Sequence, residues 1–211
     1  LIYHYCEYRS AFVNQNIYHR INGKLMNTKG PKLWDGAICI SHFLEDKAKE
    51  YNGNIKTIIV PPICDFNDFV NIKPHNSNKK YILFCGSVGF KDTIDLINDA
   101  YQESKISCNH DLYFVLSGND EKISLVKSKS NENTKFYKNL EYNQLISLFK
   151  GATALLIPLR NTVQDIARFP NKICEYVAAN GLVVTTHNGE MPYYFIDKKS
   201  GLLAKKFEVE S

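Results

Sequence analysis

The second half of the chain alternates short apolar runs with segments that are typical of amphipathic helices. Most of these runs are continuously apolar, as expected of strands that are buried on both faces. Strands that alternate with helices predict βαβ units, and therefore a parallel sheet that is covered by helices. The predicted strands comprise residues 81–85, 112–117, 135–140, 153–158 and 182–186. This pattern predicts an α/β fold with a parallel sheet of at least five strands.

The segments between these strands have helical character. The predicted helices comprise residues 92–104, 120–129, 143–152 and 170–180. The last of them begins at Pro170, which is tolerated in a first turn, and we expect it to end at Gly181. One face of this helix, expected to point outwards, holds Lys172, Glu175 and Ala179. The opposite face, expected to point into the core, holds Ile173, Tyr176 and Val177.

A polar segment at residues 71–80, which contains Pro74, separates this region from a first half with a different pattern. In the first half, Ser41 is a candidate N-cap for a helix. The elements predicted there are strands at 1–8, 37–41 and 57–62, a stretch at 11–33 that begins as a helix, and a helix at 43–51. We therefore expect residues 1–70 to be the end of an incomplete α/β domain and residues 71–211 to form a second α/β domain.

Composition excludes several classes of function. The chain has 26 Lys and Arg against 22 Asp and Glu, a net charge of +4, without the basic, aromatic-rich stripe of a nucleic-acid binder. No apolar run approaches the roughly 18 residues needed to span a membrane. None of the six cysteines lies in a C-x-x-C pair and none of the six histidines is spaced from a carboxylate in a recognisable motif, so we expect no metal and no cofactor. Four cysteines lie in apolar runs, which suits buried thiols in a reducing cytoplasm: Cys39, Cys64, Cys85 and Cys174.

The turn after the strand at 81–85 is a candidate phosphate site. Ligands of open parallel sheets bind at the carboxyl ends of the strands. The turn GSVGFKD, residues 86–92, has small residues that let the backbone approach a phosphate, and the helix N-terminus that follows favours anions. Lys91 adds a positive charge. A plain strand-to-helix turn with a solvated lysine fits the same residues, and both interpretations stay open.

The helix at 170–180 is a second candidate. Glu175 could accept hydrogen bonds from the two hydroxyls of a ribose, while Lys172 and the helix N-terminus face a diphosphate. The same two side chains also fit a solvent-facing ion pair at i and i+3, and this alternative stays open as well.

The order of these segments resembles a known family. The stretches LFKGATALLIPLR and RFPNKICEYVAANGLVVTTHNGEM look like the C-terminal domain of family 4 glycosyltransferases, which have the GT-B fold. The stretches DGAICISHFLEDKAKE and IIVPPICD resemble the end of that family's N-terminal domain and its crossover. The resemblance covers residues 35–203. It implies that residues 71–211 are a Rossmann-like nucleotide-sugar-binding domain of bacterial type, and that residues 1–70 are the end of the acceptor-side domain.

The hallmark of the family is a pair of glutamates separated by seven residues. The second glutamate matches Glu175, whereas the first falls on Ala167. Pro170 stands where the motif has a glycine, and Phe169 matches. A bacterial variant of the motif, Arg-x-Pro-x-Lys-x-x-Glu-Tyr, fits residues 168–176. The family's phosphate-binding arginine falls on Ser87, and its lysine partner matches Lys91.

By this resemblance, each candidate residue takes a role. The donor nucleotide would be bound by Gly86, Ser87, Lys91, Gly118 and Glu175. The negative charge of the leaving diphosphate would be stabilised first by Lys91, then by Lys172 and Arg168. The donor sugar would contact Phe169, with Asp165 or main-chain groups in place of the missing glutamate.

The implied reaction is transfer of a hexose from a nucleotide-diphosphate sugar to a glycan or lipid-linked acceptor, with retention of configuration and without a metal. We expect a role in polysaccharide biosynthesis, in the cytoplasm or at the inner face of the membrane, with peripheral association through the missing N-terminal domain. Because the first half is short, we expect this chain alone to bind a nucleotide and to transfer no sugar. The alternative is a non-catalytic sugar-nucleotide-binding or regulatory module on the same fold. A GT-B epimerase would need a different set of acidic and histidine residues, which we do not find.

Overall fold

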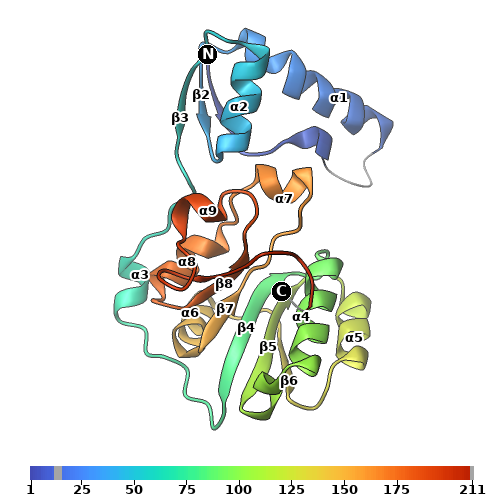
Figure 1. Cartoon of the computed structure of the whole chain (residues 1–211), viewed down its shortest axis with the longest axis vertical. Coiled ribbons are helices and arrows are strands. Elements are labelled where there is room, and N and C mark those ends of the chain that lie inside the picture. The colour runs from blue at the N-terminus through green and yellow to red at the C-terminus, as the bar shows by residue number, and fades with distance from the viewer. Residues whose placement is uncertain (12–15, 210–211) are drawn as a thin grey trace. The chain divides into compact units, whose positions relative to one another are not determined.

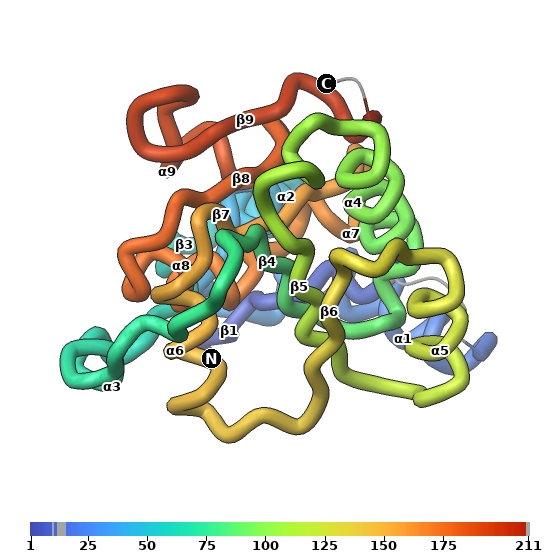
Figure 2. The backbone as a smooth tube through the Cα atoms, turned by 90° about the horizontal axis from the view of Figure 1, so that it is seen from below, coloured from blue at the N-terminus to red at the C-terminus, as the bar shows by residue number. Residues whose placement is uncertain are grey.

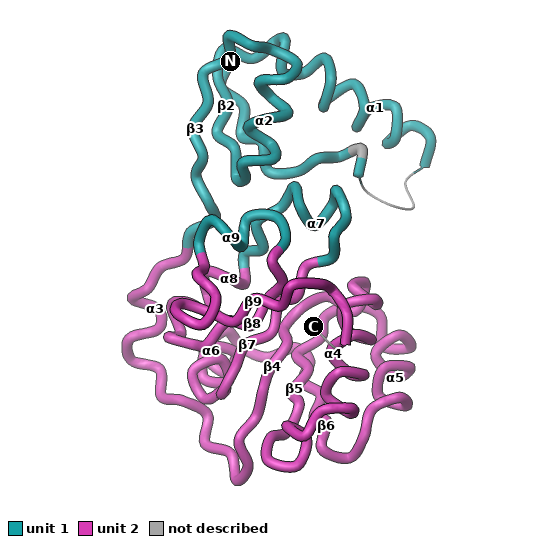
Figure 3. The backbone as a smooth tube through the Cα atoms, in the orientation of Figure 1, with its two compact units in different colours: residues 1–63, 160–171, 188–194 teal, residues 64–159, 172–187, 195–211 magenta. Residues whose placement is uncertain are grey.

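The computed structural model describes residues 1–11 and 16–209, which form two compact units (Figures 1 and 3). The first unit comprises residues 1–63, 160–171 and 188–194, and the second comprises residues 64–159, 172–187 and 195–211. The units therefore interleave along the chain, since two late segments pack with the N-terminal residues. The sequence predicted a single boundary at residue 70, and it did not predict that these two late segments pack with the N-terminal residues.

The second unit is built on a six-stranded parallel sheet with the strand order β6-β5-β4-β7-β8-β9. All five predicted strands are present, and the prediction of a parallel α/β sheet is confirmed. A three-residue strand that the sequence pattern did not predict, β9, is added at the edge. The strands are β4 (Lys80–Ser87), β5 (His110–Ser117), β6 (Thr134–Tyr137), β7 (Ala154–Leu156), β8 (Val183–Thr186) and β9 (Leu202–Ala204).

Helices cover both faces of this sheet (Figure 2). On one face, α4 (Lys91–Glu103) and α5 (Asp120–Lys129) bury apolar side chains against β4 and β5. On the other face lie α6 (Tyr142–Gly151) and α8 (Lys172–Ala178), which hydrogen-bond to β4 through Tyr81 and Tyr176. The remaining short helices of this unit are α3 (Asn67–Val70) and a 3-10 turn, η3 (Lys105–Cys108). This layering puts the carboxyl ends of β4, β5, β7 and β8 at one edge.

The end of α8 differs in part from the prediction. Val177, expected in the core, is 44% exposed, and Ala179, expected outside, is buried. The helix stops because Asn180 takes a left-handed conformation (φ 56°) and Gly181 donates its N–H to the Tyr176 carbonyl, a C-terminal motif in which asparagine replaces the usual glycine. Gly181 is needed for space instead, since a Cβ there would lie 2.2 Å from Leu155 Cδ1.

The first unit has a three-stranded parallel sheet in the order β1-β2-β3. Its strands are β1 (Ile2–Tyr5), β2 (Gly36–Cys39) and β3 (Lys56–Ile59), and its helices are α1 (Ile17–Thr28), α2 (His42–Tyr51), α7 (Val163–Ala167) and α9 (Met191–Tyr194), with 3-10 turns at Arg9–Ala11 and Gly30–Leu33. Residues 12–15 of the stretch expected to begin as a helix lie outside the described residues. The predicted N-cap is confirmed, because Ser41 Oγ accepts the N–H of Leu44 at 3.2 Å. None of the helices in the described ranges has both the length and the apolar character for a membrane crossing.

The cysteines differ in how far they are buried, so the reactivity of their thiols tests the fold. Burial raises the pKa of Cys39 to about 12 and that of Cys85 to about 11, so both stay protonated and covered at pH 8. Cys108 is exposed. We expect iodoacetamide at pH 8 to label Cys108 and to leave Cys39 and Cys85 unmodified, as read by peptide mass spectrometry. Denatured protein, which should be labelled at all three positions, is the control, and equal labelling of Cys85 and Cys108 in native protein would contradict the fold.

Candidate functional site

The turn after β4 is closed by its own backbone and by Ser87. Ser87 Oγ accepts the N–H of Gly89 at 3.1 Å, and the Ser87 carbonyl accepts the N–H of Phe90 at 3.1 Å. Gly118, at the end of β5, has φ +119°, and a Cβ there would lie 2.9 Å from Val88 Cγ1. A glycine is therefore required where the two strand ends meet. Phe90 offers no side-chain cap to α4, which begins at Lys91 directly after this turn.

Lys91 is the first residue of α4 and stays close to its own helix. Its ammonium forms an ion pair with Asp95, one turn along, and this hydrogen bond raises the pKa of Lys91. The Lys91 side chain is 61% exposed and borders a groove of about 190 Å³ between α4 and α5. A pair this exposed is weak, since water screens it, so the ammonium can leave Asp95 for an anion.

The Lys172 and Glu175 side chains form an ion pair in the first turns of α8. Glu175 is 16% and Lys172 is 31% exposed at the side chain, so the pair is half-sheltered. Beneath it, the Tyr176 hydroxyl accepts the backbone N–H of Cys85 at 3.1 Å, and the Phe149 ring lies 5.1 Å from the Tyr176 ring. α8 is therefore fastened to the strand that leads into the Gly86 turn.

The charges of this pair act on the pKa of the Cys85 thiol. Burial is the main cause of its raised pKa, followed by the Lys172 ammonium, which lowers it, and the Glu175 carboxylate, which raises it. Both charges thus act on the residue that precedes Gly86. The sequence predicted that Lys172 and Glu175 act together with this turn. Both side chains lie beside β4, the strand that leads into it. Lys91 lies at the far end of the turn, in the α4–α5 groove.

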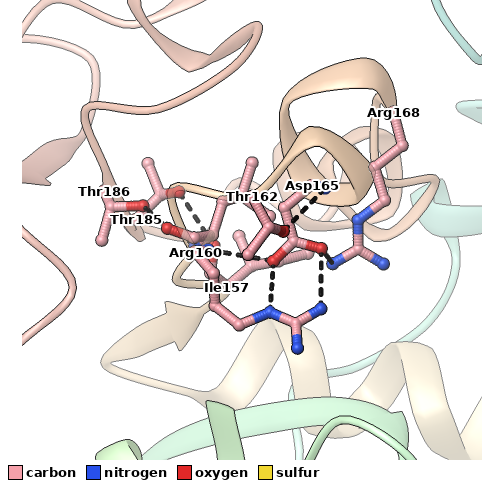
Figure 4. Close-up of polar contacts among 8 residues, drawn as sticks. Ile157, Arg160, Thr162, Asp165, Arg168, Thr185 and Thr186 are labelled. Carbon is pink, nitrogen blue, oxygen red and sulfur yellow. Dashed lines mark hydrogen bonds and ion pairs between the residues drawn. The ribbon is translucent and has the colours of Figure 1, made fainter. Parts of the chain in front are cut away.

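A second charged cluster lies in the segment 160–171 of the first unit (Figure 4). The fully buried Asp165 carboxylate accepts three hydrogen bonds from Arg160: the backbone N–H at 2.9 Å, Nε at 2.8 Å and an Nη at 3.2 Å. Arg168 forms an ion pair with the same carboxylate at 3.1 Å. Burial lowers the pKa of Arg168, while Asp165 acts against this and Arg160 adds to it. Two cations on one anion leave the cluster with a net positive charge.

Two residues that were predicted to contact the donor sugar instead contact other residues of the first unit. Both oxygens of Asp165 are bonded to the arginines, and Phe169 is 5% exposed and meets the Tyr194 ring edge-on at 4.9 Å. Ala167, which stands in place of the first glutamate, is also buried, and its carbonyl accepts the Ser41 hydroxyl at 2.7 Å. This arrangement does not favour direct contact of Asp165 or Phe169 with a ligand.

Sequence reasoning missed a histidine–carboxylate pair. Glu190, which is buried, accepts the His42 backbone N–H and bonds the His42 ring Nδ1, both at 2.8 Å. The His42 ring also stacks on Tyr193, with ring centroids 3.8 Å apart. The two partners are 148 residues apart, so no spacing rule could have paired them. Within the described parts of the chain, no three His, Cys, Asp or Glu side chains converge in a way that could hold a metal ion.

The chain matches a family model described as "Glycosyl transferases group 1" over residues 65–211. This range includes the β4 turn, both positions of the α8 ion pair and the arginine–aspartate cluster. Comparison with curated protein sequences finds no match.

Solved structures with the same fold are distant in sequence. WaaG, a glycosyltransferase involved in lipopolysaccharide biosynthesis, has a TM-score of 0.72 and 17% identity over 99% of this chain and 62% of its own. An α,α-trehalose-phosphate synthase from Burkholderia xenovorans has a TM-score of 0.64 and 9% identity, covering 89% of this chain and 53% of its own. The pneumococcal O-GlcNAc transferase GtfA, in complex with UDP and GlcNAc, has values of 0.55 and 12%, covering 84% and 35%. The chain thus spans less than two thirds of the length of each of these structures.

Proposed function

Because the chain belongs to the glycosyl transferases group 1 family, we propose that its protein transfers a hexose from a nucleotide-diphosphate sugar to a glycan or lipid-linked acceptor, with retention of configuration. The observation that carries this proposal is the Lys172–Glu175 pair, held by Tyr176 against the strand that enters the Gly86 turn. A carboxylate, an ammonium and a helix N-terminus at the carboxyl edge of a parallel sheet suit a ribose followed by a diphosphate.

In this proposal, Glu175 accepts hydrogen bonds from the two ribose hydroxyls. Gly86, Ser87 and Gly118 supply the strand ends against which the nucleotide lies, and the N-terminus of α4 faces the phosphates. The Lys172 ammonium then exchanges part of its contact with Glu175 for a phosphate oxygen. The half-sheltered site strengthens these charged hydrogen bonds relative to water.

The catalytic proposal is electrostatic. Negative charge builds up on the departing diphosphate in the transition state, so fixed cations lower the barrier. Lys91 supplies one charge after leaving Asp95, and Lys172 supplies a second. Arg168 is proposed as a third cation from its place in the family motif alone. We propose that Asp165 positions the two arginines and that main-chain groups hold the sugar. With cations in these roles, the reaction proceeds without a metal, and EDTA should leave it unchanged.

The solved structures suggest which ligands to test first. A structure described as "Trehalose-6-phosphate from E. coli" is bound with UDP-2-fluoro glucose, and GtfA is in complex with UDP and GlcNAc. WaaG acts in lipopolysaccharide biosynthesis. We therefore propose a uridine-diphosphate sugar as donor, and a growing surface polysaccharide on the cytoplasmic side of the membrane as acceptor.

The nucleotide site is tested by calorimetry with UDP, uridine and UDP-sugars. Glu175→Ala should weaken UDP binding by about 1–3 kcal/mol, or roughly 5- to 150-fold, because a charged acceptor of two hydrogen bonds is lost. Lys91→Ala should weaken binding of UDP but not of uridine. Glu50→Ala is the matched control, since Glu50 forms another i,i+3 pair with lysine, on α2. Equal UDP affinity of wild type and Glu175→Ala would overturn the ribose assignment.

The second candidate function is a non-catalytic sugar-nucleotide-binding module. It is favoured by Ala167, which is buried in place of the first glutamate of the motif. The two candidates differ in one measurement on the whole protein, namely the release of UDP from UDP-sugars in the presence of candidate acceptors. Binding with no release across acceptors would favour the module, whereas acceptor-dependent release would establish the transferase.

A further inference from the structure

The first part of the polar segment 71–80 lies along helix α6 and is held there by hydrogen bonds. The backbone N–H of His75 donates to the Ser147 carbonyl at 2.8 Å, and the Ser147 hydroxyl donates to the Lys73 carbonyl at 2.9 Å. Nearly one turn further along α6, Lys150 Nζ donates to the Phe69 carbonyl at 2.8 Å. The chain thus passes beside α6 on its way from α3 to β4 (Figures 1 and 2), on a course that is fixed by contacts within the second unit.

A groove of about 510 Å³ remains open between this segment and the beginning of α6, and we call it the α6 groove. Its lining comes from the segment 71–75, from the end of β6 with the loop that follows it, and from the first two turns of α6. None of the lining residues belongs to the β4 turn or to α8. The α6 groove is therefore separate from the proposed nucleotide site.

Three side-chain amides stand around the α6 groove, and they are those of Asn71, Asn143 and Gln144. Within the described residues, the amides of Asn71 and Asn143 take part in no hydrogen bond, and both residues are exposed. Gln144 uses its oxygen to accept the N–H of Glu141 at 3.1 Å, which leaves its NH₂ group for a ligand. An amide offers an acceptor and two donors side by side, and this suits a ligand rich in hydroxyls, since each hydroxyl both donates and accepts.

The rest of the lining is mainly apolar and carries little charge. Ile72, Leu140 and Leu148 supply aliphatic surface, and Tyr137 supplies a ring, because its hydroxyl is already hydrogen-bonded to Tyr113. The described lining residues include one lysine, Lys73, and neither Asp nor Glu. Such a lining suits neither a metal ion nor a polyphosphate. A sugar ring has hydroxyls around its rim and apolar C–H groups on its faces, so amides beside an apolar surface fit it on both counts.

We propose that the α6 groove binds a stretch of a neutral glycan chain. The inference goes beyond the proposed function, because glycan binding here requires neither a nucleotide nor a transfer step. Since the groove is formed by a segment that is already fastened to α6, little ordering is needed on binding. In a transferase that acts on a glycan, this second hold would keep the growing chain at a high effective concentration between transfers.

The test is an NMR titration of the ¹⁵N-labelled 211-residue chain with three neutral pentasaccharides, namely maltopentaose, cellopentaose and chitopentaose. The variant is Asn71→Ala/Asn143→Ala. The matched control is Asn76→Ala/Asn78→Ala, which removes two exposed amides of the same polar segment that do not line the groove. The melting temperature and the UDP affinity are measured on the same samples, and we expect both to be the same in all three proteins.

We expect at least one pentasaccharide to shift the backbone signals of residues 71–75 and 142–148, with and without saturating UDP. Asn71→Ala/Asn143→Ala should bind it on the order of 10-fold more weakly, because each amide loses about one net hydrogen bond, while the control binds as wild type does. The proposal is overturned if none of the three pentasaccharides binds, if the shifts lie at the β4 turn and α8, or if UDP displaces the sugar. It is also overturned if the variant and the control bind equally well. Absence of UDP binding would instead count against the proposed nucleotide site, and glycan shifts at α6 would stand without it.

Discussion

Replacing Asp165 with alanine is expected to destabilise the first unit by about 3–5 kcal/mol. The substitution leaves two guanidinium groups side by side without the buried carboxylate that accepts hydrogen bonds from Arg160 and pairs with Arg168. The two guanidinium charges then repel each other in a partly buried environment. The segment 160–171, which precedes α8, also loses the carboxylate that links its two arginines. Trp34, the single tryptophan of the chain, is buried in the same unit and reports its urea unfolding by fluorescence.

Two further variants separate this effect from simple loss of a charge. Asp120→Ala removes an exposed carboxylate paired with Lys138 and should change stability little, because water already screens that pair. Asp165→Asn keeps one acceptor oxygen and should retain part of the stability. If Asp165→Ala unfolds at the same urea concentration as wild type, the buried cluster does not stabilise the unit.

Replacing Phe149 with alanine is expected to cost the second unit about 3–5 kcal/mol. Phe149 is fully buried on α6 and meets Tyr176 of α8 edge-on, with the Lys172 ammonium 5.9 Å from its ring centroid. Removing the ring opens a cavity under the helix that carries Lys172 and Glu175. UDP affinity should therefore fall together with stability, although no group that we propose to touch the nucleotide has been changed.

Unfolding followed by far-UV circular dichroism, paired with UDP titration well below the melting temperature, measures both effects. Phe66→Ala is the control: Phe66 is 57% exposed, so its truncation should stay within about 0.5 kcal/mol of wild type. Phe149→Leu refills most of the cavity and should recover much of both properties. Normal UDP affinity in a strongly destabilised Phe149→Ala protein would show that α8 is held in place without α6.

The elements of the fold could be predicted because their signals are local. The buried runs of β4 and β5 and the Ser41 cap of α2 each depend on residues within a few positions of one another, and all were confirmed. The end of α8 was predicted less well. There a left-handed Asn180 ended the helix where Gly181 was expected to do so, because asparagine also tolerates that conformation. The candidate groups on α8 were found in the sequence because i,i+3 spacing and a family motif both mark them.

Only the tertiary structure decided which distant groups became partners. Glu190 reaches His42 across 148 residues, and Asp165 turns inward to two arginines although a role at the sugar had been predicted for it. A buried charge must find an opposite charge and hydrogen bonds wherever the fold supplies them, and this requirement leaves no periodic trace in the sequence. Helix α1 is a similar case, because its amphipathic sequence does not show which of its two faces packs against the rest of the unit. The packing of Gly23 and Asn27 against the first unit determines that its apolar residues, and not its polar ones, face outwards.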